Sequence, residues 1–306
     1  MIICASRRTD IPAFHSEWLM NRLRAGYAMV RNPICDNVVY KVDLDPRSVG
    51  CLYFISKNPK PLLPYLEEIE GMGYSIIFQI TMTPYGKEIE PGVPDKASVA
   101  DAFREISERF GSDRTTWRYD PVIIDERYNM RYHERKFRLL CSELSGYTDR
   151  CIFSFLDMYP KFEELKSTRS LASSSPLQRE DFMRMMGPIS KEFGIQASLC
   201  CSSRGYPEYG IDGRGCIDRE TMISLGIPFE DVSGNIRDGC RCVKNIDIGA
   251  YDTCMHNCVY CYANRITPDK RASKEYDPES EMLYGKVRET DTVTDITDRR
   301  SRITDF

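Results

Sequence analysis

The fold predicted from this sequence rests on the stretch Tyr74-Ser-Ile-Ile-Phe-Gln-Ile-Thr-Met-Thr83. This run is largely apolar, rich in β-branched and aromatic residues and about as long as one strand, which is typical of a strand buried on both faces of a parallel sheet. Its polar side chains Gln79, Thr81 and Thr83 alternate, so they share one face of the strand. The stretch therefore predicts an α/β fold whose sheet carries polar groups on one face.

Similar runs recur along the chain and alternate with helix-like segments. The other predicted strands are Ile2–Ala5, Val38–Val42, Leu52–Ile55, Thr115–Ile124, Cys151–Phe155, Ile195–Cys200 and Val243–Ile248. The predicted helices include Ser16–Ala25, Leu62–Met72, Ser98–Phe110, Tyr132–Leu144 and Arg179–Phe193. One strand and one helix recur about every 35–45 residues, which is the spacing of βα units. We therefore expect a complete or partial TIM-like (βα) barrel.

Two features modify this simple alternation. The linker between Val38–Val42 and Leu52–Ile55 is too short for a crossover helix, so these two strands are expected to form a hairpin. We also expect three parts: a barrel body at 1–199, a cysteine-rich cluster-binding region at 200–266 that completes the barrel, and a charged tail at 267–306. Within the tail, Tyr276–Gly285 could dock on the body, and the last ~15 residues are expected to be mobile.

The composition limits the class of protein and its partners. The 306 residues are 42% hydrophobic and 29% charged, which describes a globular chain with a sizeable core. No apolar run approaches the roughly 18–20 residues of a membrane helix, and the N-terminus lacks the order of a signal peptide. We therefore expect a cytoplasmic protein with no membrane partner. The net charge of −4 provides no global basic field, so a nucleic-acid partner is not expected.

Polar residues follow or interrupt the predicted strands where a βα barrel places its reactive groups, at the carboxyl ends. The candidate cofactor-binding residues among them are Arg7, Arg8, Asp10, Lys57, Asn58, Gln79, Arg118 and Asp120. Each has a structural explanation as well: Arg8 could pair with Asp10 on the surface, and Arg118 with Asp120 inside the barrel. Taken together, they predict one charged cavity that suits a zwitterionic, polar cosubstrate.

Thirteen cysteines in a chain too large to need disulfide staples predict metal ligands plus buried thiols. Three of them lie in Cys254-Met-His-Asn-Cys258-Val-Tyr-Cys261. At this spacing three thiolates can bind three irons of a [4Fe–4S] cluster and leave the fourth iron open to a small molecule. Tyr260 can shield the cluster or cover a bound adenine ring. A zinc site is the alternative, with His256 or another cysteine as fourth ligand.

A second set of cysteines lies upstream of the triplet. Its members are Cys200, Cys201, Cys216, Cys240 and Cys242. Four of them could hold a second [4Fe–4S] cluster, because the first pair ends a predicted strand and the last pair precedes the strand leading to the triplet. A structural zinc ion and free thiols are the competing interpretations.

The triplet, with its aromatic residue before the last cysteine, resembles the signature of the radical S-adenosylmethionine (SAM) superfamily. The resemblance implies that SAM chelates the open iron and that one-electron reduction yields a 5′-deoxyadenosyl radical. It also implies an electron donor such as a ferredoxin or flavodoxin. In that superfamily the signature follows the first strand, whereas here it follows the last predicted strand, Val243–Ile248. The barrel is therefore expected to be circularly permuted relative to radical SAM enzymes.

Longer strings resemble one uncharacterised family, the DUF1848 proteins, over nearly the full chain. They are Asp247-Ile-Gly-Ala-Tyr-Asp-Thr-Cys254 with Cys258-Val-Tyr-Cys-Tyr-Ala-Asn264, Ser6-Arg-Arg-Thr-Asp-Ile-Pro12 and Ser56-Lys-Asn-Pro59. That family is known for a radical-SAM-like cysteine motif and has no assigned reaction. The first functional hypothesis is thus a radical SAM-type enzyme with an unknown substrate. The alternatives are a non-catalytic iron–sulfur protein for electron transfer or redox sensing, and a nucleic-acid repair or modification protein.

Overall fold

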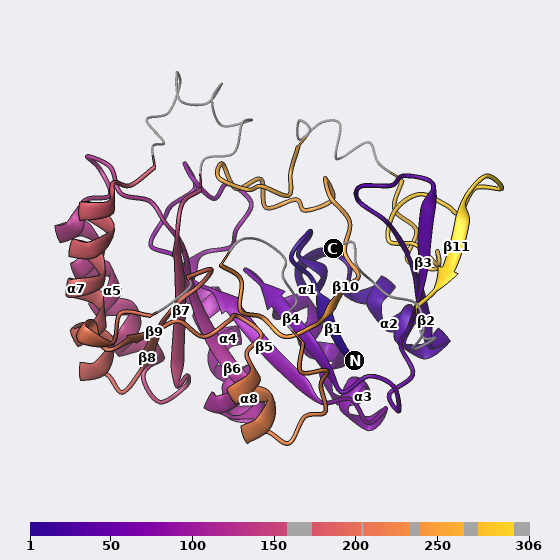
Figure 1. Ribbon diagram of the computed structural model, residues 1–306, viewed down its shortest axis with the longest axis horizontal. Coiled ribbons are helices and arrows are strands. Elements are labelled where there is room, and N and C mark those ends of the chain that lie inside the picture. The colour runs from indigo at the N-terminus through magenta and orange to yellow at the C-terminus, as the bar shows by residue number, and fades with distance from the viewer. Residues whose placement is uncertain (158–172, 203–204, 233–238, 266–274, 297–306) are drawn as a thin grey trace.

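The computed structural model describes residues 1–157, 173–202, 205–232, 239–265 and 275–296, and its centre is an eight-stranded sheet flanked by helices (Figure 1). The strands stand in the order β10-β1-β4-β5-β6-β7-β8-β9, and every neighbouring pair is parallel. They are β1 (Ile2–Ala5), β4 (Cys51–Ser56), β5 (Ile76–Thr81), β6 (Thr115–Val122), β7 (Arg150–Phe155), β8 (Gln196–Leu199), β9 (Ile211–Asp212) and β10 (Ile246–Asp247). The predicted α/β class is confirmed, and the arrangement is consistent with a barrel-like (βα) layout.

The helices begin and end close to the predicted positions. They are α1 (Ile11–Phe14), α2 (Ser16–Ala25), α3 (Leu66–Gly71), α4 (Lys96–Phe110), α5 (Met130–Leu144), α7 (Pro176–Glu192) and α8 (Arg219–Ser224), with 3₁₀ turns η1 (Lys60–Tyr65), η2 (Ser112–Arg114) and η4 (Pro207–Tyr209). Side-chain caps fix several starts: Asp95 accepts a hydrogen bond from Ser98 N at α4, and Ser175 forms a capping box at α7. The predicted helix Leu62–Met72 is divided into η1 and α3, and Pro64 lies within the 3₁₀ part.

The two faces of the large sheet are covered differently. One face carries Phe54, Phe78 and Trp117, which belong to the main hydrophobic core together with Phe137 of α5 and Phe182 of α7. The other face, which we call the loop face, carries side chains at alternate positions that are neighbours in the strand register. They include Cys4, Tyr53, Ile77, Gln79, Arg118, Ile152 and Ser198. Side chains from 216–232 and 239–243, orange in Figure 1, pack on the loop face.

The predicted hairpin between Val38–Val42 and Leu52–Ile55 is wrong. β3 (Val38–Asp43) instead pairs antiparallel with β2 (Tyr27–Arg31), whereas β4 lies between β1 and β5 in the large sheet. Burial explains the separation: β4 is covered almost throughout, as a central parallel strand requires, whereas β2 alternates between buried and half-buried residues. β2 was not among the predicted strands, because Tyr27-Ala-Met-Val-Arg31 does not alternate apolar and polar residues.

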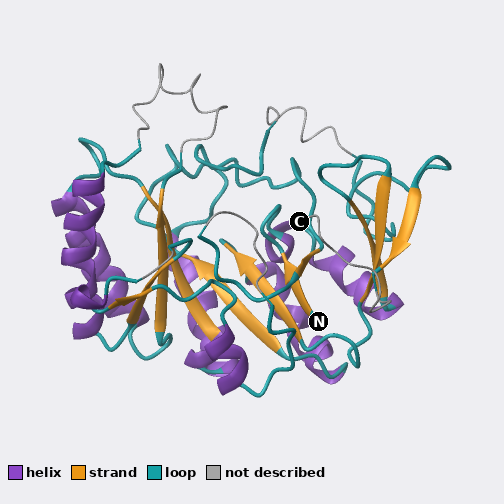
Figure 2. Ribbon diagram, in the orientation of Figure 1, coloured by secondary structure: helices purple, strands orange, loops and turns teal. Residues whose placement is uncertain are grey.

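A three-stranded sheet, β11-β3-β2, lies at one end of the molecule, and α5 and α7 lie side by side at the other (Figures 1 and 2). β11 (Thr292–Asp295) pairs parallel with β3, so Thr292–Asp295 is held by strand pairing where the sequence predicted a mobile end. Residues 297–306 lie outside the described ranges. The predicted docking of Tyr276–Gly285 is confirmed, because Trp18 Nε1 donates to Ser280 O at 3.0 Å and Met282 is buried.

The large sheet crosses the expected boundary at 199/200, because β9 and β10 both join it. Among the described residues no helix is both long and apolar enough to cross a membrane.

Candidate functional site

The cysteine triplet follows β10, and strand pairing places it beside the N-terminal strand. In the parallel register Ile246 is opposite Ile3, and Asp247 is opposite Cys4. The Asp247 carboxylate then joins the two strand ends, since it accepts hydrogen bonds from Arg7 N at 2.7 Å and from Arg8 Nε at 3.1 Å. Burial acts to raise the pKa of Asp247, but the two guanidinium groups outweigh it and hold the pKa below its usual value. Arg7 and Arg8 therefore have a structural partner that the sequence did not reveal.

The three thiols of the triplet lie together at the edge of the core. Cys254 and Cys258 are buried and Cys261 is half-buried. Burial is the largest effect on Cys258 and raises its pKa to about 12, while Lys57 opposes the rise. Burial also raises the pKa of Cys254, with further contributions from the charges of Asp10 and of the other two thiols. The three sulfur atoms thus lie within electrostatic reach of one another.

The loop between β5 and α4 packs against the triplet loop and forms backbone hydrogen bonds with it. Ile89 O accepts a hydrogen bond from Val259 N at 2.9 Å, and His256 O accepts one from Gly92 N at 2.8 Å. The approach at Gly92 is close enough that a Cβ there would lie 2.5 Å from Met255 O. A glycine is required at this position because any side chain would meet the backbone of the triplet loop.

A buried charge network lies beside Cys258, with the Glu90 carboxylate at its centre. Lys57 Nζ lies 2.9 Å from Glu90 Oε1, and Lys96 Nζ lies 2.6 Å from Glu90 Oε2. The Tyr260 hydroxyl donates to the same carboxylate, and Thr83 Oγ1 donates to it at 2.8 Å. Two ammonium groups face a single carboxylate, so the network has a surplus positive charge next to the thiols.

The pKa values of Lys57 and Glu90 agree with this charge pattern, whereas at Lys96 burial outweighs the charge of Glu90 and lowers the pKa below its usual value. Burial acts to lower the pKa of Lys57, but the charges of Glu90 and Cys258 outweigh it and raise the pKa above its usual value. Burial likewise acts to raise the pKa of Glu90, and the two lysines hold it far below its usual range. Among the predicted cofactor-binding residues, Lys57 and Tyr260 lie against Cys258, and Asp10 lies beside His256 and Cys254. Glu90 and Lys96 were missed, because neither is part of a motif and both become partners of the triplet only through the loop between β5 and α4.

Asp10 connects three segments around the triplet. It caps α1 by accepting from Ala13 N at 3.1 Å, and its Oδ2 accepts from Lys57 N at 2.7 Å and lies 2.8 Å from His256 Nε2. His256 Nδ1 lies 3.2 Å from Gly92 O, so both ring nitrogens are used. In this structure both ring nitrogens of His256 therefore face oxygen atoms. Asp10 and Arg8 do not form the pair expected of a surface site, because each has a buried partner elsewhere.

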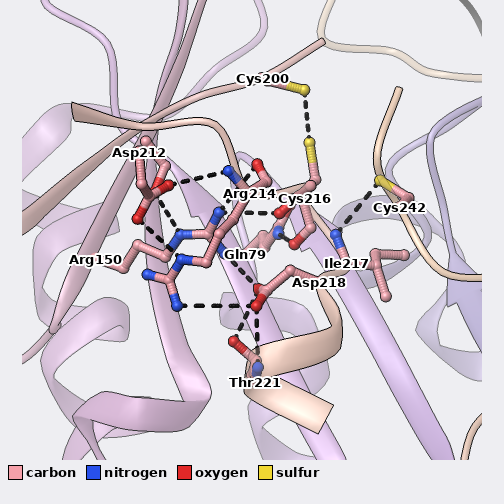
Figure 3. A network of polar contacts seen from close by, with 12 residues as sticks. Gln79, Arg150, Cys200, Asp212, Arg214, Cys216, Ile217, Asp218, Thr221 and Cys242 are labelled. Atoms are coloured by element: carbon pink, nitrogen blue, oxygen red, sulfur yellow. Dashed lines mark hydrogen bonds and ion pairs between the residues drawn. The ribbon is translucent and has the colours of Figure 1, made fainter. Parts of the chain in front are cut away.

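The second cysteine group (Cys200, Cys201, Cys216, Cys240 and Cys242) comes together from three segments. Figure 3 shows one cysteine of each segment: Cys200, Cys216 and Cys242. Cys200 Sγ lies 2.7 Å from Cys216 Sγ and 3.7 Å from Cys201 Sγ. Cys242 hydrogen-bonds with the thiols of Cys216 and Cys240, and its sulfur also accepts from Ile217 N at 3.5 Å. Hydrogen bonds from Cys200 and Cys242 hold the pKa of the Cys216 thiol well below its usual range.

Three of the predicted cofactor-binding residues lie beside this second group rather than beside the triplet. Arg118 forms a half-buried ion pair with Asp120, donates to Gln79 Oε1 at 2.8 Å and hydrogen-bonds with the Cys216 thiol. Gln79 Nε2 donates to Tyr53 OH at 2.8 Å, and that hydroxyl donates to Cys216 O at 2.9 Å. The structural pairing of Arg118 with Asp120 that the sequence offered is thus present.

The predicted polar residues accordingly divide between neighbouring sites. Asp120 is close enough to contribute to the raised pKa of Lys57, which connects the second group electrostatically with the triplet. Asn58 is half-buried next to Lys57, and its backbone N donates to Ser56 Oγ at 2.9 Å. Within the described ranges no three or more His, Cys, Asp or Glu side chains are already spaced to hold a metal ion. The donor chemistry of both groups nevertheless fits a thiophilic metal, because each offers at least three thiols beside buried cationic side chains.

Fold and site together define an α/β protein with a parallel sheet and two groups of cysteines near its strand ends. The chain belongs to the family described as "Domain of unknown function (DUF1848)", whose model matches residues 2–263. The match contains both cysteine groups and the whole large sheet, and it ends before β11. No curated protein and no solved structure matches the chain.

Proposed function

We propose that the protein is a cytoplasmic iron–sulfur enzyme of the radical SAM type, acting on an unknown substrate. Cys254, Cys258 and Cys261 would hold a [4Fe–4S] cluster with one open iron, on a barrel-like fold circularly permuted relative to radical SAM enzymes. The observation that carries the proposal is the position of the triplet. Its loop follows β10, the outermost strand on its side of the described sheet order, and it faces the ends of β1 and β4.

The strand order supports the permutation. If β10 is taken as the first strand, the cysteine loop follows the first strand of a parallel sheet, and β1 and β4 become the second and third. Strand neighbours rather than chain order decide which side chains meet at a strand end. The late position of the cysteine loop in the sequence is therefore compatible with the spatial arrangement that the resemblance implies, in which the loop follows the first strand of the sheet.

The residues around the triplet suit the binding of such a cluster and of SAM. A bound cluster of this kind supplies one electron for the reductive cleavage of SAM. The surplus positive charge of Lys57 and Lys96 stabilises thiolates, and the rings of Tyr85 and Tyr260 limit access of water. Lys57 and Tyr260 are the best placed of the predicted residues to contact SAM, because both lie against Cys258.

The hydrogen bonding of the nearby thiols supports an open iron. Cys240 and Cys242 could in principle supply a fourth ligand, which would favour the alternative of a closed, electron-transferring cluster. Cys242 instead hydrogen-bonds with Cys216 and Cys240 in the second group. On the outer side Met255 and Tyr262 are exposed beside the half-buried Cys261, and they offer a docking place for a ferredoxin or flavodoxin.

The test uses anaerobically reconstituted full-length protein. Wild-type protein should contain about four irons attributable to the triplet and, once reduced, should convert SAM to 5′-deoxyadenosine. Cys258→Ala should lose both properties, whereas Cys141→Ala, which removes a lone buried thiol on α5, should keep them. Iron bound without any change in the EPR signal on adding SAM would favour the electron-transfer or redox-sensing alternative. Zinc without iron would overturn the proposal, and tight DNA binding at physiological salt would favour the nucleic-acid alternative.

A further inference from the structure

We propose that the second cysteine group forms a metal centre of its own, which holds a thiophilic metal and is separate from the triplet. It would use Cys216 and Cys242 with two of the three remaining thiols, Cys200, Cys201 and Cys240. The ligand chemistry fits either a zinc ion or an iron–sulfur cluster, and the two are distinguished by the experiment below. This centre does not depend on the proposed function, because none of its ligands belongs to the triplet.

The chain is shaped to bring these segments together. The five thiols come from the end of β8, from the loop before α8 and from the segment before β10. A Cβ at Gly215 would lie 2.5 Å from Arg241 O, and a Cβ at Gly239 would lie 2.9 Å from Cys201 O. Glycines at these two positions let the three backbones approach closely enough for their thiols to meet. Such an arrangement is more than the burial of single cysteines as small apolar residues requires.

Cys216 is held in place from below by a buried ion pair (Figure 3). Arg150 lies 2.5 Å from Asp218 and also donates to Gly215 O at 2.9 Å and to Ser198 Oγ at 2.7 Å. Both charged side chains are almost fully buried. A buried pair of this quality fixes the loop that presents Cys216, although it adds little to stability by itself. Arg150 and Asp218 are thus positioning residues, because they act on the site through the loop.

The charge around the thiols suits ligands that must lose their protons. Arg118 is half-buried and bridges Asp120 and the Cys216 thiol, so a cation already faces the group. Two sulfur atoms on tetrahedral zinc lie about 3.8 Å apart, as follows from a Zn–S distance of about 2.3 Å. Cys200 Sγ and Cys216 Sγ lie 2.7 Å apart. Metal binding would therefore move these two sulfur atoms apart. Cys201 and Cys240 are less buried than the other three cysteines and lie at the rim of the group.

The experiment measures iron, zinc and acid-labile sulfide in full-length protein purified without oxygen. The triple variant Cys254→Ala/Cys258→Ala/Cys261→Ala should retain either about one zinc or about four irons per chain. Cys216→Ala/Cys242→Ala should lose that same amount. The matched control, Cys51→Ala/Cys151→Ala, removes two buried thiols of the sheet outside the group and should keep it. A folded triple variant that contains neither metal would overturn the inference, whatever the triplet binds in the wild type.

Alkylation of the wild-type protein covers the case in which the double variant fails to fold. With a metal bound, Cys216 and Cys242 should resist iodoacetamide in the native protein and become reactive once a chelator has removed the metal. Cys51 and Cys151, which are buried in the sheet, should remain unreactive in both states. If chelation leaves the labelling of Cys216 and Cys242 unchanged, the second group holds no metal and the inference fails.

Discussion

The triplet and the second cysteine group differ in how the chain assembles them. The triplet lies on one loop of eight residues, 254–261, so its spacing is visible in the sequence and folding only has to supply the neighbours. The second group is drawn from residues 200–242, and its thiols meet only because β8 and the segments before α8 and β10 converge on the loop face. A local motif thus predicts its own ligands, whereas a dispersed one depends on long-range packing.

Their electrostatic support differs in the same way. At the triplet one carboxylate, Glu90, faces two lysines and leaves surplus positive charge beside the thiols. At the second group two one-to-one ion pairs, Arg118 with Asp120 and Arg150 with Asp218, hold the surroundings. The network at the triplet therefore leaves a net positive charge beside the thiols, whereas the ion pairs at the second group are neutral overall and mainly hold side chains and loops in place. Four predictions test this contrast, and they are ordered from the largest expected effect to the smallest.

Replacing Glu90 should have the largest effect. Glu90→Ala leaves the half-buried Lys57 and Lys96 without their shared, buried carboxylate, and breaking a buried ion pair from one side costs about 3–5 kcal/mol. Because two ammonium groups lose their partner at once, we expect a loss of unfolding free energy in the upper half of that range in urea denaturation. Glu67→Ala, at an exposed position of α3, is the control and should change stability little. A Glu90→Ala protein as stable as the wild type would show that the lysines are hydrated rather than buried.

Removing Asp218 should cost somewhat less, because only one cation loses its partner. Asp218→Ala leaves Arg150 buried and also removes the cap of α8, where Asp218 accepts from Thr221 N at 2.9 Å. We expect a loss of about 3–4 kcal/mol in the same denaturation assay. Iron at the triplet should not change, which separates the two groups. Simultaneous loss of triplet iron in a folded protein would contradict their independence.

Lowering the pH should reduce the free energy of unfolding through protonation of His15, which lies near the triplet. This residue packs between Phe14, whose ring contacts His256, and the docked Tyr276 and Tyr284. Burial lowers the pKa of His15 to about 4, with Asp10 opposing the shift. The unfolded chain binds a proton near its ordinary pKa of about 6.5, so stability falls as the pH drops from about 6.5 to about 4. The wild type should lose about 3 kcal/mol more than His15→Leu over this window, and equal pH profiles would contradict the assignment.

The smallest effect is expected from adding a methyl group at the tight contact below the triplet. Gly92→Ala forces the supporting loop away from Met255 O and His256, at a cost of about 1–3 kcal/mol. Gly71→Ala is the matched control, since a Cβ at Gly71 meets nothing within 4 Å. Thermal unfolding should show a lower midpoint for the first variant and little change for the second. Equal midpoints would mean that the triplet loop adjusts freely.

Much of the fold could be predicted because the pattern of apolar and polar residues within one segment indicates whether that segment forms a strand or a helix. The strand Ile2–Ala5 and the helix Ser16–Ala25 have the predicted bounds, and the apolar run at 74–83 contains a central strand, β5. The predicted hairpin was wrong because a short linker indicates only that no helix lies between the two strands. It does not indicate which strand becomes the partner. β3 pairs with β2 and β11, and the latter lies about 250 residues away in the sequence.

The sequence by itself determined the spacing of Cys254, Cys258 and Cys261 and the α/β alternation, because both are properties of neighbouring residues. Only the tertiary structure decided that Glu90 and Lys96 lie beside the triplet. It also decided that Asp247 accepts hydrogen bonds from Arg7 and Arg8, and that Gln79 and Arg118 contact Cys216 of the second cysteine group. These partners are tens to hundreds of residues apart. Their meeting depends on strand order and register, which follow from packing the whole sheet at once rather than from any local pattern.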